Sequence, residues 1–197
     1  MNGSPYLSSE DSELLRSAMA GRSGGSVLEI GAGNGGNLVS MTGRFGLIVG
    51  TDLVRPGMDD WAGAHASFVL ADRASCFRDE TFDLVVFNPP YVRGEGYQDV
   101  AVDGGRRGEA PLGFLAEALR VVKASGTVLM LLSSESPVEE AATAACEAKG
   151  FGLVPVASKH LFYEELTVYS ASRVDFSGDY SDTSAVSLLH QVPASPA

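Results

Sequence analysis

The sequence predicts a doubly wound α/β fold built around a mostly parallel β-sheet. Short apolar runs alternate along the chain with segments that have the residue pattern of helices. Several of these runs are almost continuously apolar, which is typical of strands covered on both faces by helices. A length of 197 residues suits one compact domain and leaves little room for a second.

The predicted elements follow one another in a regular order. The first is a helix over 8–20, which has serines at its start, carboxylates in its first turn and one apolar face. A later helix over 137–149 has proline at its start and glycine just past its end. The remaining predicted elements are, in chain order, strand 26–30, helix 37–43, strand 46–52, a poor helical segment at 56–64, strands 67–72 and 82–87, helix 110–123, strand 126–133, and closing strands 151–157 and 161–171.

The composition of the chain changes near residue 172. Residues 172–197 are rich in Ser, Asp and Pro and have no sustained periodicity. This pattern is typical of a segment that does not bury a core of its own. We therefore expect one domain over 1–171, followed by a flexible tail over 172–197.

The charge and the cysteine content limit which binding partners and which cellular location we expect for this protein. The chain has 14 Lys and Arg against 25 Asp and Glu, a formal net charge of −11. Such a surface repels phosphates, so stable nucleic-acid binding is not expected. The two isolated cysteines, Cys76 and Cys146, indicate neither a disulfide framework nor an intrinsic metal site. There is no signal-peptide pattern and no apolar stretch of membrane-spanning length, so we expect a cytoplasmic protein that does not enter a membrane.

A glycine-rich loop connects the first predicted strand to the next helix. It reads Glu29-Ile-Gly31-Ala-Gly33-Asn-Gly35, and glycines are required where a backbone turns sharply against a ligand. The spacing differs from the G-x-G-x-x-G of dinucleotide sites, and the Glu29 carboxylate would repel a pyrophosphate but suits a cation. The loop therefore favours S-adenosylmethionine (SAM), which carries a sulfonium and an ammonium, over NAD. A simple turn is the alternative interpretation.

Aspartates end the second and third predicted strands. Asp52 ends the second strand, where a carboxylate can accept hydrogen bonds from both hydroxyls of a ribose. Asp72 ends the third strand, where it can accept a hydrogen bond from an adenine amino group, with Arg73 beside it. Each aspartate taken singly fits a surface-capping role equally well. Together with Glu29, these acids at three successive strand ends predict a site for a nucleoside and a cation.

The tetrapeptide Asn88-Pro89-Pro90-Tyr91 follows the fourth predicted strand directly. Its prolines fix the backbone and hold Asn88 in an extended geometry. A planar amide or amine nitrogen is a poor nucleophile until its N–H groups are held and its lone pair is aimed at a methyl group. We expect the Asn88 side-chain oxygen and the Pro89 carbonyl to accept those two hydrogens, while Tyr91 stacks on the planar group. Catalysis then depends on placement and electrostatic support. A rigid proline turn is the alternative interpretation.

These motifs resemble those of class I SAM-dependent methyltransferases that carry N-P-P-Y, over roughly residues 6–171. Within that class the sequence is similar to the HemK-related protein-glutamine methyltransferases, in particular to their short archaeal and eukaryotic branch. Tyr6-x-x-x-Glu10-Asp11-Ser12 matches the opening Y-x-P-x-E-D-T/S of that branch, with Ser8 in place of proline. Residues 104–108 (GGRRG) and 161–166 (LFYEEL) are similar to two further motifs of the family. The resemblance implies a Rossmann-like, seven-stranded, mostly parallel sheet with helices on both faces and an antiparallel last strand.

The resemblance also implies the site residues. The hydroxyl residue of the opening motif, here Ser12, contacts the methionine part of SAM in that branch. The predicted cofactor-binding residues are then Ser12, Glu29, Gly31, Gly33, Asp52, Asp72, Arg73 and Asn88, and the predicted catalytic residues are Asn88, Pro89, Pro90 and Tyr91.

The reaction and the partners follow from the same resemblance. Members of this branch methylate N5 of the glutamine in the Gly-Gly-Gln motif of class I peptide chain release factors. They commonly need a small zinc-binding activator protein, which pairs along the third strand. The acidic composition suits a protein substrate. The alternatives are N6-methylation of adenine in DNA or RNA by the same four residues, and a SAM-binding subunit without turnover.

Overall fold

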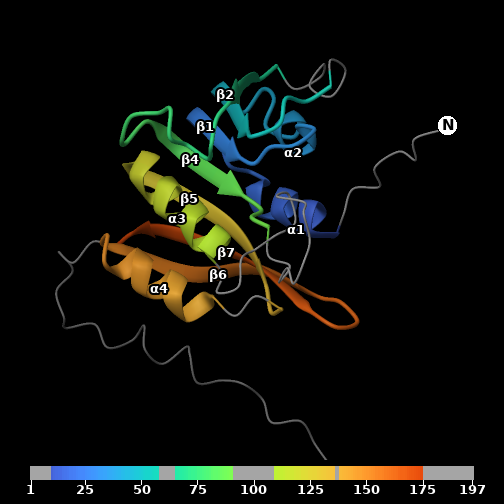
Figure 1. Ribbon diagram of the computed structural model, residues 1–197, viewed down its shortest axis with the longest axis vertical. Helices are drawn as coiled ribbons and strands as arrows, with labels where there is room; N and C mark the ends of the chain where they lie inside the picture. The colour runs from blue at the N-terminus through green and yellow to red at the C-terminus, as the bar shows by residue number, and fades with distance from the viewer. Residues whose placement is uncertain (1–9, 58–64, 91–108, 136–137, 175–197) are drawn as a thin grey trace, which may run out of the picture.

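Seven strands form one sheet in the computed structural model of the protein, which describes residues 10–57, 65–90, 109–135 and 138–174. The strands are β1 (Gly24–Ile30), β2 (Phe45–Asp52), β3 (Ser67–Leu70), β4 (Phe82–Phe87), β5 (Val122–Ser133), β6 (Phe151–His160) and β7 (Glu165–Arg173). They lie in the order β3-β2-β1-β4-β5-β7-β6 (Figure 1). Neighbours from β3 to β5 pair in parallel, whereas β7 is antiparallel to both β5 and β6. The predicted sheet is confirmed, including the antiparallel last strand.

Helices cover both faces of this sheet. α1 (Glu10–Met19) and α2 (Gly36–Val39) lie on one face, and α1 contacts β5, β6 and β7. α3 (Glu109–Val121) and α4 (Glu139–Glu147) lie on the other face, against β4 and β5 and against β6 respectively (Figure 1). In the described part of the chain, no helix has the length and apolar character that crossing a membrane requires.

The core is divided into two layers by the sheet. Along β4, Leu84 and Val86 pack with the α1 and α2 side chains, and the intervening Val85 and Phe87 pack with α3 and α4. Successive side chains of a strand point to opposite faces, so a strand covered on both sides must be apolar throughout. The continuous apolar runs in the sequence have this origin.

Several boundaries differ from the prediction. The helix predicted over 37–43 is shorter, because α2 ends at Val39 and residues 40–43 form turns. β1 begins two residues earlier than predicted, at Gly24, and β6 ends three residues later, at His160.

β5 begins at Val122, four residues before the predicted start, because Val122 already pairs with Phe82. The strand passes Gly126, where a Cβ would lie 2.8 Å from the carbonyl oxygen of Asp83, so only glycine fits there. β3 ends at Leu70, so Asp72 lies in the following turn rather than at the last position of the strand.

The closing pair of strands also has different limits. Residues 161–164 form the turn between β6 and β7, closed by a hydrogen bond from the Leu161 N–H to the Glu164 carbonyl (2.8 Å). β7 therefore starts at Glu165 rather than at residue 161, and it ends at Arg173. The predicted tail lies outside the described residues from position 175 onward, and it stays a prediction.

Candidate active site

The predicted site residues that the structure describes gather at one edge of the sheet. β1, β2, β3 and β4 are parallel, so their carboxyl ends meet at the same edge. There Ile30 at the end of β1 pairs with Thr51 on one side and with Phe87 on the other. β1 and β4 are neighbours, but the chain continues from β1 to β2 on one side and from β4 to β5 on the other. Open α/β sheets bind ligands at the carboxyl ends of two such strands.

Asn88 is held by its amide nitrogen at the end of β4. Its Nδ2 donates to the Oδ2 of Asp11 at 2.7 Å. Its Oδ1 is buried and has no hydrogen-bond partner among the described residues. A buried carbonyl oxygen without a partner is costly, so such an atom is typical of a site that a ligand completes. The bond to Asp11 fixes which end of the amide faces the site, and the end left free is the acceptor.

Asp11 joins Asn88 to the first turn of α1. Its other oxygen, Oδ1, accepts the backbone N–H of Ser12 at 2.8 Å. Ser12, predicted to contact the cofactor, is therefore next to the residue that holds the predicted catalytic amide. Pro89 is buried and Pro90 half-buried directly after Asn88. Tyr91, the fourth predicted catalytic residue, lies outside the described residues.

Glu29 is buried beneath the glycine-rich loop with 3% of its surface exposed. Its Oε1 accepts from Asn37 Nδ2 at 2.7 Å, and Arg16 Nη1 of α1 donates to Asn37 Oδ1 at 3.2 Å. Its Oε2 is buried without a partner in the described structure. Burial raises the pKa of Glu29 to about 8, with a smaller rise from Asp52, although Asn37 and Arg16 act in the opposite direction. A cationic ligand beside this side chain would favour its ionised form.

Asp52, at the end of β2, holds the glycine-rich loop that follows the neighbouring strand β1. Its Oδ2 accepts the Gly33 N–H at 2.9 Å, and its Oδ1 accepts the Val54 N–H at 3.0 Å. A carboxylate has about four acceptor positions, so each oxygen retains capacity for a further donor. Gly33 and Gly31 have φ of 51° and 72°, the left-handed region that glycine adopts at little cost. The structure thus joins Asp52 to Gly33 by a hydrogen bond, and the role of both residues in binding a nucleoside stays a prediction.

Arg73 lies against α3 beside the predicted site. Its guanidinium is 5.6 Å from the ring centre of Phe114, and the same ring lies 3.2 Å from where a Cβ of Gly31 would be. Arg73 also forms an ion pair with the exposed Asp72 at 3.3 Å. The arginine therefore packs between the third-strand turn and α3, and it holds the aspartate that was predicted to meet the adenine.

Three residues of this edge carry contacts that the sequence did not assign to them. Asp11 holds Asn88, Asn37 binds Glu29, and Phe114 supports Gly31. Asn37 is buried in the four-residue helix α2, although the sequence predicts that a polar residue in such a short helix faces water. The only sequence feature that points to its contact with Glu29 is its position directly after the glycine-rich loop. Asp11 belongs to the opening motif, but its partner is 77 residues away.

Solved structures share this architecture, which is the Rossmann-like methyltransferase fold. No protein-family model matches the sequence, and no curated protein sequence matches it. Three similar solved structures are methyltransferases or their complexes, and all are less than 25% identical to this chain, so the likeness concerns the fold.

One of them is the E. cuniculi Mtq2–Trm112 complex, responsible for the methylation of the translation termination factor eRF1. It is 24% identical, with a TM-score of 0.70 over 86% of this chain and 98% of that chain. Magnesium protoporphyrin IX methyltransferase from Synechocystis, with bound SAM, is 12% identical, with a TM-score of 0.61 over 88% and 87%. The 1,6-didemethyltoxoflavin-N1-methyltransferase of Burkholderia thailandensis, with bound S-adenosylhomocysteine, is 18% identical, with a TM-score of 0.54 over 84% and 77%.

Proposed function

We propose that this protein is a SAM-dependent N-methyltransferase of the short HemK-related branch. Its substrate is the glutamine side chain in the Gly-Gly-Gln motif of a class I peptide chain release factor. The observation that carries the proposal is the state of Asn88. Its nitrogen is held by Asp11, and its buried oxygen, at the carboxyl edge of the sheet, lacks a hydrogen-bond partner among the described residues. An acceptor fixed in this way selects a group that donates N–H, as a primary amide does.

The residues around the glycine-rich loop fit SAM. The unpartnered Glu29 Oε2 suits a cation, and the Asp52 oxygens suit ribose hydroxyls, with Gly31 and Gly33 keeping the loop free of side chains. When bound, SAM supplies a methyl carbon attached to a cationic sulfur. Glu29 would hold its cationic part, Asp52 its ribose hydroxyls, Asp72 its adenine amino group and Ser12 its methionine part.

The protein's own contribution to the reaction is to hold and orient the acceptor. The Asn88 oxygen accepts one N–H of the substrate amide, and the Pro89 carbonyl accepts the other. With both hydrogens held, the amide plane is fixed and the nitrogen lone pair faces the methyl group. The proton leaves after transfer, so no strong base is needed. Placement of this kind accounts for a large share of many enzymatic rate accelerations.

The proposed activator is a small zinc-binding protein that pairs with β3. This strand is at the end of the sheet and pairs only with β2 among the described strands. An edge strand is a site for strand addition by a partner. Leu70 in β3 is 62% exposed, and Leu53 and Val54 just after β2 are also exposed apolar residues. A partner that covers this edge would bury them.

The test is a methyl-transfer assay with labelled SAM, with and without the activator. The substrates are the release factor, its variant with Ala in place of the target glutamine, and DNA and RNA oligonucleotides. We expect label in the release factor only, at the target glutamine. Asn88→Ala should nearly abolish turnover while SAM still binds in calorimetry. An equal loss of SAM affinity and turnover would contradict the role given to Asn88.

The same assay separates the alternative functions. Transfer to an oligonucleotide that weakens steeply with added salt would support N6-adenine methylation instead, because nucleic-acid binding is salt-dependent. SAM binding without transfer to any of these substrates would support a non-catalytic subunit. Leu70→Asp tests the activator site separately, since it should reduce co-purification of the activator without altering SAM affinity.

A further inference from the structure

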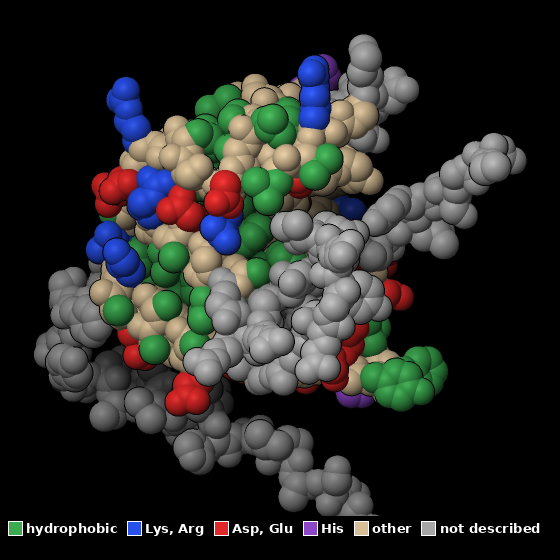
Figure 2. All heavy atoms as spheres, in the orientation of Figure 1, with side chains coloured by type: hydrophobic (Ala, Val, Ile, Leu, Met, Phe, Trp, Pro, Cys, Tyr) green, Lys and Arg blue, Asp and Glu red, His purple; other side chains and the backbone are tan. Residues whose placement is uncertain are grey.

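Two aromatic side chains project into solvent at the turn between β6 and β7. Phe162 is 98% exposed and Tyr163 is 93% exposed. Their ring centres are 6.4 Å apart, and their planes are tilted by 41°. In Figure 2, which has the orientation of Figure 1, hydrophobic side chains project at this hairpin end with acidic ones next to them. Adjacent aromatics left wholly in water are unusual on a surface, and exposed apolar patches mark interaction sites.

The turn that carries these rings is anchored at its base. The Leu161 N–H donates to the Glu164 carbonyl at 2.8 Å and closes the turn. Glu165 exchanges two hydrogen bonds with Ser134, both of 2.9 Å. The Glu164 carboxylate accepts the hydroxyl of Ser133 at the end of β5. The aromatic pair therefore stands on a base fixed to the sheet, which lowers the ordering cost when a partner binds.

The turn lies at the edge of the sheet where Asn88 lies. β6 runs in the same direction as β4 and β5, because β7 is antiparallel to both of its neighbours. The end of β6 and the end of β4 therefore share one edge. Phe87, the residue before Asn88, pairs with Met130, and Ser133, three residues further on β5, contacts the base of the turn. A protein substrate that reaches Asn88 approaches this edge.

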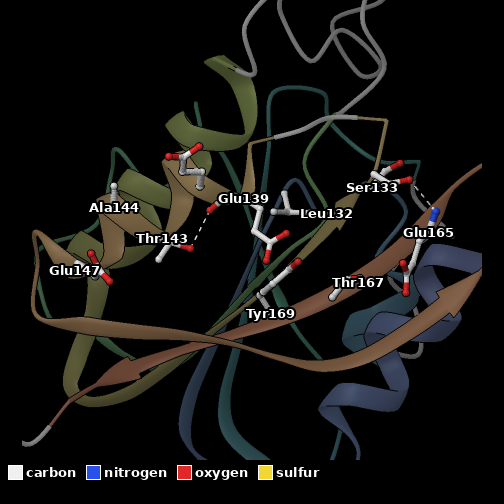
Figure 3. A pocket seen from close by; sticks show the side chains of 11 residues that line it. Leu132, Ser133, Glu139, Thr143, Ala144, Glu147, Glu165, Thr167 and Tyr169 are labelled. Carbon is white, nitrogen blue, oxygen red and sulfur yellow. Dashed lines mark hydrogen bonds between the residues drawn. The ribbon is translucent and has the colours of Figure 1, made fainter. Parts of the chain in front are cut away.

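An acidic cavity lies between α4 and the sheet, next to the base of the turn (Figure 3). Its volume is about 860 Å³. The described residues that line it include no Lys, Arg or His, and four of them are the glutamates Glu139, Glu140, Glu147 and Glu165. Lys159, a cation on β6 near the turn, forms an ion pair with Glu10 of α1. The charge that the cavity presents to an approaching chain is negative.

We propose that Phe162, Tyr163 and the adjacent acidic cavity form a docking surface for a basic segment of the protein substrate. Arginine and lysine stack on aromatic faces through their cationic heads and apolar stems, and they pair with carboxylates. The aromatic pair and the glutamates of the cavity, of which Glu165 lies at the base of the turn, offer both contacts to one segment. Complementary charge also speeds encounter and rejects acidic partners. This inference rests on the proposed function, because it assigns the surface to the protein that carries the methylated glutamine.

The test compares steady-state kinetics with the intact release factor as the varied substrate. The variant is F162S/Y163S, and its matched control is Val174→Ser, which removes an exposed apolar side chain just past the other end of β7. We expect the KM for the release factor to rise roughly tenfold or more in the double variant. Its kcat, its SAM affinity and its Tm should stay close to those of the wild type. The control should leave all four quantities unchanged.

Charge is tested with E140K/E147K against Glu80→Lys, an exposed glutamate in the turn before β4. We expect the cavity variant to raise KM and the control to leave it unchanged. A wild-type KM in F162S/Y163S, or a fall of kcat at unchanged KM, would overturn the docking role while the proposed function stands. A wild-type protein that transfers no methyl group to the release factor in the presence of activator would refute the proposed function and this inference together.

Discussion

Replacing Glu29 by glutamine tests whether the buried carboxyl group is protonated in the free protein. With its pKa raised to about 8 by burial, the native state holds a proton between pH 4.5 and 8 that the unfolded chain releases. The stabilisation from this proton is therefore complete below pH 4.5 and is lost as the pH rises through 8. The full shift corresponds to about 5 kcal/mol, at about 1.4 kcal/mol per pH unit. Glutamine is neutral at every pH, so Glu29→Gln removes this dependence.

The measurement is urea unfolding of wild type and Glu29→Gln at pH 5, 7 and 8.5. Relative to wild type, the variant should gain about 4 kcal/mol of unfolding free energy between the lowest and highest pH. Burying the glutamine amide costs the same free energy at every pH. This cost therefore cancels when the change in unfolding free energy between two pH values is compared. Glu135→Gln, at an exposed carboxylate, is the control and should follow the wild type. Parallel curves for wild type and Glu29→Gln would refute the reasoning, because Glu29 would then already be ionised in the free protein.

The same proton should appear in cofactor binding. If the proposed cationic cofactor draws Glu29 into its ionised form, binding at pH 7 releases up to one proton. Calorimetry in two buffers of different ionisation enthalpy measures that release directly. Glu29→Gln should bind SAM more weakly and release no proton. Equal proton release in wild type and variant would assign the proton to another group.

Three further substitutions have definite expected outcomes. Asp11→Ala should lower kcat by about 10- to 100-fold, because the Asn88 amide loses its fixed orientation; SAM affinity in calorimetry should change little, and Asp11→Asn should restore part of kcat. Asp83→Ala should lower the unfolding free energy at pH 7 by about 1–2 kcal/mol in urea. The pKa of Asp83 is lowered mainly by the hydrogen bond from Lys123. This stabilisation is therefore present above the ordinary pKa of 3.8 and should be lost as pH falls below it. Gly126→Ala should lower the Tm, with about 1–3 kcal/mol lost, because a Cβ would lie 2.8 Å from the Asp83 carbonyl oxygen.

The sheet could be predicted from sequence because its strands are covered on both faces. A run such as Leu84–Phe87 is apolar at both sets of alternating positions because both of its faces are covered, and few other structures require this. The start of β5 could not be predicted in the same way. Its first residues include Lys123, Ala124 and Ser125, which resemble a turn, and their pairing with the sheet depends on tertiary contacts.

The candidate site was only partly predictable for a related reason. Glu29, Asp52 and Asn88 directly end or follow strands, so the alternation of elements places them at one edge. The partners that orient them come from elsewhere in the chain. Asp11 is 77 residues from Asn88, and Phe114 of α3 is the ring on which Arg73 packs. Local patterns do not contain such pairs, and the predicted stacking role of Tyr91 stays a prediction.

The antiparallel direction of β7 determines where the sequence of this protein can change without altering the sheet. Because β7 lies between β5 and β6 and runs against them, the chain must reverse at the end of the sheet that holds Asn88. A β7 running in the same direction as its neighbours would instead have needed a long crossover connection back to the opposite edge of the sheet. The two exposed residues of this turn, Phe162 and Tyr163, can thus change in chemistry without disturbing the hydrogen-bonded ladder on either side. Under the proposed docking role, exchanging these two side chains would change which protein substrates are selected while Asn88 and the residues around it stay unchanged.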